Sequence, residues 1–588
     1  MFLCITLYFS FWYNDFFKDF LMDRRTFCSL TAGALFGSGL TAVNSSADES
    51  TAQLHFTQTQ TGAGPFHASG QGRQPHILLI SADMVGPDLY HPTRPLSRHV
   101  QLPAIRSLMQ DGTFFANAFC TVPLCSPSRA SYLTGRYSYV QGNGERAPLG
   151  LETELRPNDT IFPEYLKACG YVARQVGKCH VGEAKFIDAF GDNDQAWNRW
   201  SPPVFDDDDF LAYQRSLGVK PQKYSREIVF RMQDRRTPGN SVGGWVVQQD
   251  GKPFPMEAQY SYYLGKKAIA TIESLLSNGS IEHHPMYLQL DFFDPHQPFS
   301  IPAGFEERER ELRRIMTVPE SWHTAEQRNF ERAPDEPEII DIYRRYWGIY
   351  DPKTLIDYRI AYILQMELVD HVIGMVLARL KELGLYDNTL VAFISDHGEM
   401  DGRRAIVDKG VYLYPDIVRV PMVMKLPGNA SRQHATVSAP ASLLDLSQTI
   451  LDYAGIQPEA KFDGISLRKA LETGQGEEER TLLFFGGWHV GVNFDCGIQK
   501  RAADGHRYLY SYNCTSTVDE LFDLDSNDAV NLIDKPEYAA LRKEMIQHLG
   551  AALQSDPRWV GYWAEFRIAR AQDLPKTTGD MQLFALPD

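Results

Sequence analysis

Three short apolar runs, each followed closely by acidic or imidazole side chains, constrain the fold of this 588-residue chain more than any other feature. The runs are "HILLIS" at 76–81, followed by Asp83; "MYLQLDFFDPH" at 286–296, ending in His296; and "TLVAFIS" at 389–395, followed by Asp396 and His397. Continuous apolar runs of this length are typical of strands that are buried on both faces of a sheet.

Between these runs the apolar pattern changes its period. Residues 357–383 place apolar side chains on one helical stripe, and Gly384 follows as a stop signal. Alternating strands and helices indicate an α/β fold built on a large, mostly parallel sheet flanked by helices. Ligands of such sheets bind beyond the carboxyl ends of the strands, so we expect Asp83, His296 and Asp396 to converge.

The first 47 residues differ from the rest and are predicted to be a leader. From Met22 onward, the paired Arg24 and Arg25 precede a mild run of small apolar residues, as in a twin-arginine export signal. We expect Met22 to be the true start. The apolar run is too short for a good membrane span, although an anchor formed together with residues 1–21 is the alternative. The expected location is periplasmic or secreted, in a bacterium, with no stable membrane span.

The remaining chain divides by composition. Residues 48–73 are polar and contain Gly, as in a linker. Residues 74–458 carry the strand–helix alternation and form the expected catalytic domain, in which 187–260 fits the alternation poorly and is predicted to be an insertion near the site. Residues 459–588 are β-rich and then helical, which predicts a smaller C-terminal α+β subdomain.

Charge and cysteine usage argue against a nucleic-acid-binding protein and against a fold held together by disulfides or by a CxxC metal site. The formal net charge is -16, which argues against a general nucleic-acid binder. The eight cysteines show neither a disulfide framework nor a metal-binding CxxC spacing. Cys496 and Cys514 could pair in an oxidising compartment, and the sequence leaves this open.

One polar stretch, "LCSPSRASYLTGR" at 124–136, places a cysteine at a predicted helix start. Ser126 suits a helix cap and Pro127 suits the first turn. Cys125 would then lie at a helix N-terminus, where anions are favoured, with Arg129 one turn further on. From these residues alone, a reactive thiol and a structural cysteine are both open.

The same stretch resembles the signature of the type I, formylglycine-dependent sulfatases of the alkaline-phosphatase-like superfamily, C-x-P-S-R followed by L-T-G-R. Other stretches resemble further segments of that family, in the family's order. They are "GYVARQVGKCHVG" (170–182), "DPHQPF" (294–299), "LVAFISDHGEMDG" (390–402), "DKG" (408–410), "RVPMVMKLPG" (419–428) and "ELFDLDSNDAVNLID" (520–534). The resemblance covers roughly residues 75–545.

The resemblance implies that a maturation enzyme oxidises Cys125 to formylglycine. A hydrated aldehyde carries two hydroxyls: one attacks sulfur, and the other breaks down the sulfated adduct by expelling sulfate. A plain Ser or Cys has no second hydroxyl and would remain esterified. The expected reaction is hydrolysis of sulfate monoesters, with a sulfated carbohydrate as the expected substrate.

The resemblance also implies roles for five polar residues around the reacting group. Arg129 would support the formylglycine, while Lys178 and Lys409 would bind sulfate oxygens. His180 would handle the hydroxyl proton during release. His296, together with Lys409, would protonate or stabilise the leaving alkoxide.

The metal ligands carried over from the family are Asp83, Asp396 and His397, together with the oxygen that residue 125 would supply once Cys125 is converted. They imply one divalent cation. Calcium is the family default and is kept first, but it prefers six to eight oxygens. Imidazole favours Mn²⁺ over calcium, so Mn²⁺ is second.

The chain departs from the family pattern at three positions. Met84 stands where a second acid or amide is usual, His397 stands where Asn is common, and Arg404 stands where His is common. Because some phosphonate monoester hydrolases share His at the second position, a phosphonate monoester or phosphodiester hydrolase is the alternative function. A non-catalytic binding protein is a third hypothesis, although every expected catalytic position is filled.

Overall fold

The computed structural model describes residues 56–58, 74–138, 154–156, 159–191, 196–428, 435–490, 492–513, 516, 518–526 and 530–559. The predicted leader, with Met22, Arg24 and Arg25, and Cys514 of the suggested cysteine pair lie outside these ranges. Their features therefore stay predictions. Part of the predicted linker is described: β1 (Phe56–Gln58) pairs antiparallel with β15 (Ile456–Pro458).

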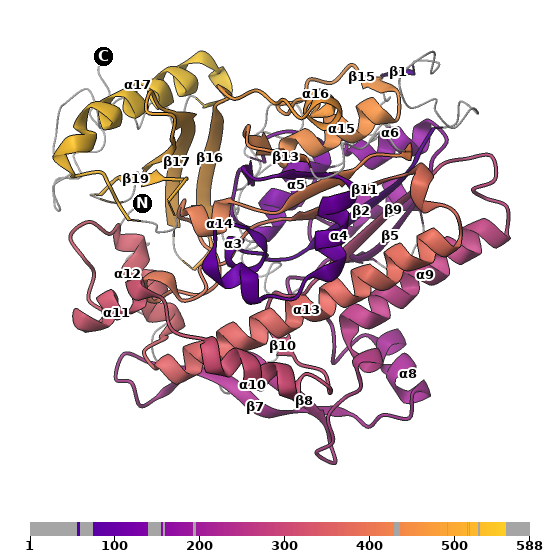
Figure 1. Ribbon diagram of the computed structural model, residues 1–588, viewed down its shortest axis with the longest axis horizontal. Helices are drawn as coiled ribbons and strands as arrows, with labels where there is room; N and C mark the ends of the chain where they lie inside the picture. The colour runs from indigo at the N-terminus through magenta and orange to yellow at the C-terminus, as the bar shows by residue number, and fades with distance from the viewer. Residues whose placement is uncertain are drawn as a thin grey trace, which may run out of the picture. The chain divides into compact units, whose positions relative to one another are not determined.

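A mixed sheet of eight strands forms the centre of the fold (Figure 1). Its order is β13 (Ala435–Val437), β3 (Thr113–Phe115), β12 (Met422–Lys425), β11 (Thr389–Ser395), β2 (His76–Ala82), β9 (Met286–Phe292), β5 (Val172–Lys178) and β6 (Ala196–Trp197). All neighbours are parallel except β12, which is antiparallel to both β11 and β3. The predicted α/β class with a mostly parallel sheet is confirmed.

The three apolar runs form the central strands. Every residue of β2, β9 and β11 is buried, as expected for strands covered on both faces. Helices α4 (Pro103–Asp111), α9 (Tyr260–Ser277) and α13 (Pro352–Glu382) pack together beside the sheet. Helices α5 (Cys125–Thr134), α6 (Phe162–Ala168), α7 (Glu183–Phe190) and α15 (Leu444–Tyr453) form a second group, joined by contacts of α6 with α5, α7 and α15.

The predicted helix at 357–383 is the core helix α13. It begins earlier than predicted, at Pro352, because Asp351 caps it by accepting a hydrogen bond from the Lys353 N–H, and Pro suits the first turn. This helix is long and apolar enough to cross a membrane, but 83% of its most apolar window is buried inside the protein.

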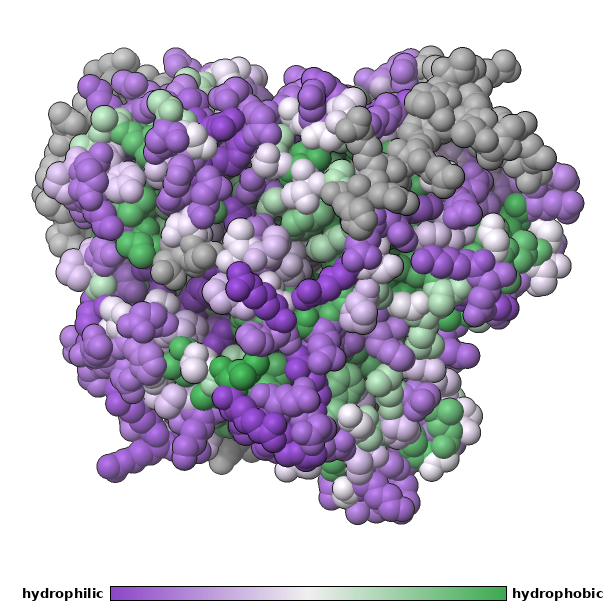
Figure 2. All heavy atoms as spheres, viewed as in Figure 1, coloured by the Kyte–Doolittle hydropathy of each residue, from purple (hydrophilic) through white to green (hydrophobic). Residues whose placement is uncertain are grey.

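On the face drawn in Figure 2, hydrophobic side chains lie scattered among hydrophilic ones.

The segment 187–260, predicted as an insertion, first contributes β6 to the edge of the central sheet. The segment then forms α8 (Asp208–Ser216) and a hairpin of β7 (Gln222–Arg231) and β8 (Pro238–Gln248), which is not part of the central sheet. β10 (Phe299–Ser300) joins that hairpin. The chain between β10 and α13 forms α10 (Glu306–Ile315), α11 (Glu320–Gln327) and α12 (Glu338–Trp347).

The C-terminal part is an antiparallel sheet with a helix, as predicted. Its strands are β16 (Leu482–Trp488), β17 (Val492–Arg501), β18 (Arg507–Tyr512) and β19 (Glu520–Asp523), and its helix is α17 (Ala539–Ser555). The remaining short elements are α3 (Pro87–Tyr90), β4 (Ala118–Phe119), α14 (Pro415–Val418), β14 (Ala441–Ser442) and α16 (Arg468–Thr473).

Candidate active site

The carboxyl ends of adjacent parallel strands bring the predicted site residues together. The order β11, β2, β9, β5 places the ends of four strands side by side, with Ser395 paired to Ala82 and Ala82 paired to Phe292. Asp396 and Asp83 follow β11 and β2 directly, and Lys178 ends β5. The sheet topology therefore gathers side chains that are hundreds of residues apart in the sequence.

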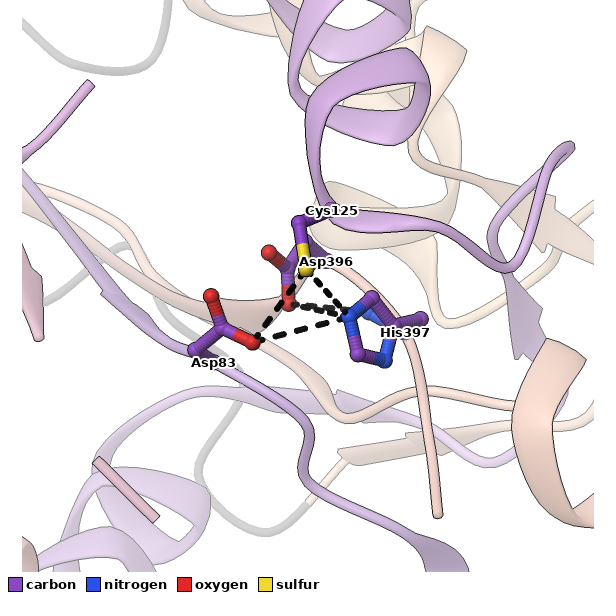
Figure 3. A group of neighbouring side chains, drawn as sticks. All are labelled: Asp83, Cys125, Asp396 and His397. Carbon is purple, nitrogen blue, oxygen red and sulfur yellow. Dashed lines mark hydrogen bonds and ion pairs between the residues drawn. The ribbon is translucent and has the colours of Figure 1, made fainter. Parts of the chain in front are cut away.

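Four buried side chains point toward one another at this edge (Figure 3). Asp83, Cys125, Asp396 and His397 offer donor atoms that all lie within 4.8 Å of one another. The Cys125 Sγ atom lies 3.1 Å from His397 Nε2 and 3.8 Å from Asp83 Oδ1. Two carboxylates, an imidazole and a thiol in a water-poor pocket are a donor set suited to a divalent cation.

Cys125 reaches this cluster as the first residue of α5. The residue before it, Leu124, is the N-cap, so the prediction that Ser126 caps the helix is wrong. Leu124 is extended and offers no side-chain cap, and Pro127 still lies in the first turn. The cap thus lies two residues earlier than predicted, which makes Cys125 the first residue of the helix, among the other buried donors.

The imidazole of His397 is oriented as a metal ligand would be. Its Nδ1 lies 2.9 Å from the backbone carbonyl oxygen of Gly398, which can only accept a hydrogen bond. Nδ1 therefore carries a proton, and Nε2, the nitrogen that would be available to a cation, faces Cys125 and Asp83. A carbonyl that fixes the tautomer from behind is a common arrangement for histidines that bind metals.

Arg129 ties the two carboxylates of the cluster together. Its Nε lies 2.9 Å from Asp396 Oδ2, its Nη2 lies 3.4 Å from Asp83 Oδ2, and its Nη1 lies 3.5 Å from Asp291 Oδ1. Nη1 also donates to the Lys178 carbonyl oxygen at 3.2 Å. This completely buried guanidinium contacts the acids of the site rather than residue 125.

Lys178 and His180 approach Cys125 from the end of β5. The Lys178 Nζ donates to Asp83 Oδ2 and, at 2.9 Å, to the backbone carbonyl oxygen of Trp200. His180 is 3% exposed, has a backbone φ of 56° and interacts with the Cys125 thiol. Among the residues that the structure describes, its Nδ1 has no hydrogen-bond partner. This nitrogen is therefore free to exchange a proton.

His296 and Lys409 form a pair on the other side of the cluster. The Lys409 Nζ lies 2.5 Å from His296 Nε2, and Asp408 Oδ1 lies 3.0 Å from the same ammonium. The His296 Nδ1 lies 2.6 Å from the Gln297 carbonyl oxygen and so carries a proton. Nε2 must therefore accept from Lys409, and the two side chains can pass a proton between them.

The electrostatics of the site favour an anion at residue 125. Burial would raise the pKa of the Cys125 thiol, but Lys178 and Lys409 hold it well below its usual range. Burial would likewise raise the pKa of Asp83, yet the neighbouring cations, Lys178 first, lower it to about 2. Burial would lower the pKa of His397, but the Asp396 carboxylate raises it to about 9.

Comparison with known proteins decides the family. The family model described as Sulfatase matches residues 75–456, which is more than half of the chain. The chain belongs to the sulfatase family. A second model, described as the C-terminal part of N-sulphoglucosamine sulphohydrolase, matches residues 402–555. The protein is therefore a sulfuric ester hydrolase, as the resemblance implied.

Curated relatives of this sulfatase share about a quarter of its residues. An arylsulfatase of Clostridium perfringens is 25% identical over 81% of this chain and 94% of the relative. An N-acetylglucosamine-6-O-sulfatase of Bacteroides thetaiotaomicron is 23% identical over 81% and 86%, respectively. An ulvan-active sulfatase of Formosa agariphila is 25% identical over 82% and 81%.

Solved structures share the fold of this sulfatase. One is a phosphonate monoester hydrolase from Silicibacter pomeroyi, with a TM-score of 0.60 and 22% identity. The match covers 81% of this chain and 95% of the hydrolase chain. A protein solved in complex with its substrate D-glucosamine-2-N,6-O-disulfate has a TM-score of 0.54 and 17% identity, and covers 86% and 100%. At these identities the likeness concerns the fold.

Two acids of the sulfatase site escaped the sequence analysis. Asp291, in β9, contacts Arg129 and accepts hydrogen bonds from Ser81 Oγ at 2.5 Å and Gln175 Nε2 at 3.0 Å. Asp408 precedes Lys409 and pairs with it. An acid near a strand end was a usable signal for Asp291, and the "DKG" run contained Asp408.

The backbone of Met84 contacts the candidate metal ligand Asp396, although the Met84 side chain cannot supply an oxygen ligand. Its N–H donates to Asp396 Oδ1 at 3.2 Å, and its carbonyl accepts from the Tyr362 hydroxyl at 2.6 Å. Its φ is 66°, in the left-handed region. Arg404, another departure from the family pattern, contacts Tyr414 and Glu336.

Proposed function

We propose that the protein is an exported sulfatase that hydrolyses sulfate monoesters of a sulfated saccharide through a formylglycine made from Cys125. The observation that carries the proposal is the place of Cys125. It is the first residue of a buried helix, 3.1 Å from His397 and 3.8 Å from Asp83, within a group of potential metal ligands. A structural cysteine has no need of that position.

The described residues fit one divalent cation. Asp83, Asp396, His397 and residue 125 would hold it, and the fixed tautomer of His397 supports this donor set. Two carboxylates balance the charge of a divalent ion. Calcium stays first and Mn²⁺ second, since four protein donors including a nitrogen are few for calcium. The ion would supply positive charge to oxygens that bear negative charge in the reaction.

The converted residue 125 would supply a hydrated aldehyde, with one hydroxyl as nucleophile and the other for release of sulfate. A maturation enzyme that generates formylglycine is the implied partner. The cations around residue 125 would bind the anionic sulfate group. His180 would take the proton of the releasing hydroxyl at the ring nitrogen that interacts with residue 125.

Lys178 and Lys409 would bind sulfate oxygens from two sides. Both are buried, so their charges act in a site of low dielectric constant. Lys409 would also pass a proton to His296 Nε2, 2.5 Å away, and from there to the leaving alkoxide oxygen. Asp408 would hold the Lys409 ammonium in place at 3.0 Å. Arg129 would keep Asp83 and Asp396 at the spacing that a cation needs.

A saccharide is the proposed alcohol because relatives that match most of the chain are named an N-acetylglucosamine-6-O-sulfatase and an ulvan-active sulfatase. The second candidate is a phosphonate monoester or phosphodiester hydrolase. His397 at the cluster and the fold shared with a phosphonate monoester hydrolase favour that candidate.

Export is proposed from the leader, where Arg24 and Arg25 follow Met22. The proposed location is the periplasm or the medium. The proposed organisation is a catalytic domain over 74–458 and a C-terminal subdomain over 459–588. Changing Arg24 and Arg25 together to Lys should trap the protein in the cytoplasm, and unchanged periplasmic accumulation would show that the leader is of another kind.

One experiment on the purified enzyme tests the chemistry. The peptide that contains residue 125 should be lighter than its cysteine form by roughly 18 Da, the difference between a thiol and an aldehyde. Cys125→Ala should abolish turnover of an aryl sulfate. Unmodified Cys125 in fully active enzyme would overturn the mechanism, and a much larger kcat/KM for an aryl phosphonate monoester would favour the second candidate.

A further inference from the structure

The burial of the proposed catalytic side chains indicates where the alcohol part of a substrate would lie. Lys178, His180, His296 and Lys409 are at most 3% exposed, so a sulfate group bound among them would be enclosed. The alcohol that carries the sulfate is far larger and must extend from this pocket toward solvent. Side chains that touch both the pocket and solvent are therefore the ones that meet the alcohol.

Trp200 is such a side chain. It is 49% exposed, yet its ring centroid lies 5.9 Å from that of the catalytic His296, with the ring planes tilted by 56°. Its backbone carbonyl accepts the hydrogen bond from Lys178 Nζ at 2.9 Å. The backbone of Trp200 thus contacts a lysine proposed to bind sulfate, while its half-exposed indole lies beside His296.

The proposed role of His296 fixes which part of the substrate lies beside that indole. His296, supplied by Lys409, gives its proton to the ester oxygen that leaves with the alcohol. The first carbon of the alcohol is bonded to that oxygen, so the alcohol begins within contact of His296. The half-exposed Trp200 indole lies beside His296 and is therefore within reach of that part of the substrate.

We infer that the indole of Trp200 is the platform on which the sugar ring of the substrate stacks, and that it determines specificity for the alcohol. The inference rests on the proposed function. One face of a pyranose ring carries C–H groups and packs well on a flat aromatic surface. Among the described residues no group accepts from the indole N–H, which leaves this donor for a sugar hydroxyl.

The test compares Trp200→Ala and Trp200→Phe with the mature wild-type enzyme. Sulfate release is measured on sulfated mono- and disaccharides from glycosaminoglycans, carrageenan and ulvan, and KM is determined for the best of them. We expect Trp200→Ala to raise this KM roughly tenfold, because stacking and apolar burial are both lost. Trp200→Phe keeps a flat surface and should raise it less.

Inhibition by inorganic sulfate distinguishes loss of sugar stacking on Trp200 from damage to the residues that bind the sulfate group. Its inhibition constant against 4-nitrophenyl sulfate should change by less than about twofold in Trp200→Ala, because the Lys178 contact uses the Trp200 backbone. The control is Leu217→Ala, another half-exposed apolar side chain, 42% exposed after α8, which should leave both constants unchanged.

Each failure has its own signature. An unchanged saccharide KM in Trp200→Ala, with the wild type active on that saccharide, overturns the platform and leaves the proposed function intact. Equal losses for saccharide and inorganic sulfate also overturn it, since they indicate a distorted sulfate pocket. A wild type that desulfates only 4-nitrophenyl sulfate overturns the saccharide assignment for Trp200. A wild type inactive on every sulfate ester overturns the proposed function itself.

Discussion

The Nε of Arg129 lies 2.9 Å from Oδ2 of Asp396, although 267 residues separate them in the chain. Arg129 belongs to the helix that begins with Cys125, and Asp396 follows the central strand β11. The Ser128 hydroxyl strengthens the same junction by donating to the Asp396 carbonyl oxygen at 2.6 Å. Helix α5 is thus attached to the sheet at the point where the candidate nucleophile meets the candidate metal ligands.

Replacing Arg129 by Met should destabilise the fold as well as abolish activity. Three buried carboxylates, Asp83, Asp291 and Asp396, would lose their shared cation, and breaking a buried ion pair costs about 3–5 kcal/mol. Thermal unfolding of the variant should show a Tm well below that of the wild type. The control is Arg310→Met, an exposed residue paired with Glu307, which should leave the Tm nearly unchanged. Equal Tm values for all three proteins would show that Arg129 does not contribute to the stability of the fold.

Replacing Lys409 by Met should make turnover depend more steeply on the leaving group. The variant lacks the ammonium that lies 2.5 Å from His296 Nε2 and is proposed to supply the proton for the departing oxygen. Aryl sulfates of increasing phenol pKa should therefore lose rate progressively, by up to about 10²–10⁴-fold for the poorest leaving groups. The slope of log kcat/KM against phenol pKa isolates this role, because loss of sulfate binding lowers every substrate equally. Parallel lines for wild type and variant would assign Lys409 to binding alone.

Much of the fold and of the site could be predicted from the sequence because both follow from periodicity and order. The runs at 76–81 and 389–395 have no polar interruption, and only strands covered on both faces tolerate this. Once they are parallel neighbours, Asp83 and Asp396 must meet. The stripe at 357–383 likewise predicted α13, and the Gly384 stop lies close to its observed end at Glu382.

The remainder depended on contacts that no local pattern specifies. The predicted cap of α5, Ser126, lies two residues after the observed cap, Leu124, because Ser and Pro suit the first turn of a helix as well as its start. The position of Asp291 near a strand end is a signal in the sequence, but its partner Arg129 is known only once α5 packs against β9. Trp200 lies in a segment without periodicity, and only the folded chain places its ring beside His296.

Chelation should inactivate the enzyme, and residue 84 offers a way to change the response. The substrate-free protein presents only Asp83, Asp396, His397 and residue 125 as donors, so EDTA should remove the cation readily. Met84→Asp adds an oxygen donor next to Asp83, and the left-handed φ of 66° is one that Asp tolerates better than most residues. We expect calcium to bind about tenfold more tightly, measured by metal content after dialysis and by activity after adding Ca²⁺, Mn²⁺ or Zn²⁺ singly.

Met84→Leu is the control for that substitution, because it adds no donor and should leave the affinity unchanged. If Met84→Asp behaves like Met84→Leu, the side chain of residue 84 does not face the cation. Asp294 is then the next acid to test, although its Oδ2 already accepts a hydrogen bond from Ser261 Oγ. Asp294→Asn should weaken calcium binding if that carboxylate contributes.

Gly177→Ala should disrupt the junction of β5 and β9, where Gly177 pairs with Asp291. Gly177 has a φ of +106°, and a Cβ atom there would lie 2.0 Å from the backbone oxygen of Asp291. Either β9 moves, shifting Asp291, or β5 moves, shifting Lys178, and we expect a cost of about 3 kcal/mol. Gly474→Ala is the control: its φ is +75° but nothing lies within 4 Å of the added carbon, so only the backbone cost of about 1 kcal/mol applies. Urea unfolding should rank the wild type, Gly474→Ala and Gly177→Ala in that order, and kcat should fall only in Gly177→Ala. A Gly177→Ala variant as stable as Gly474→Ala would mean that the two strands are not in the close contact described.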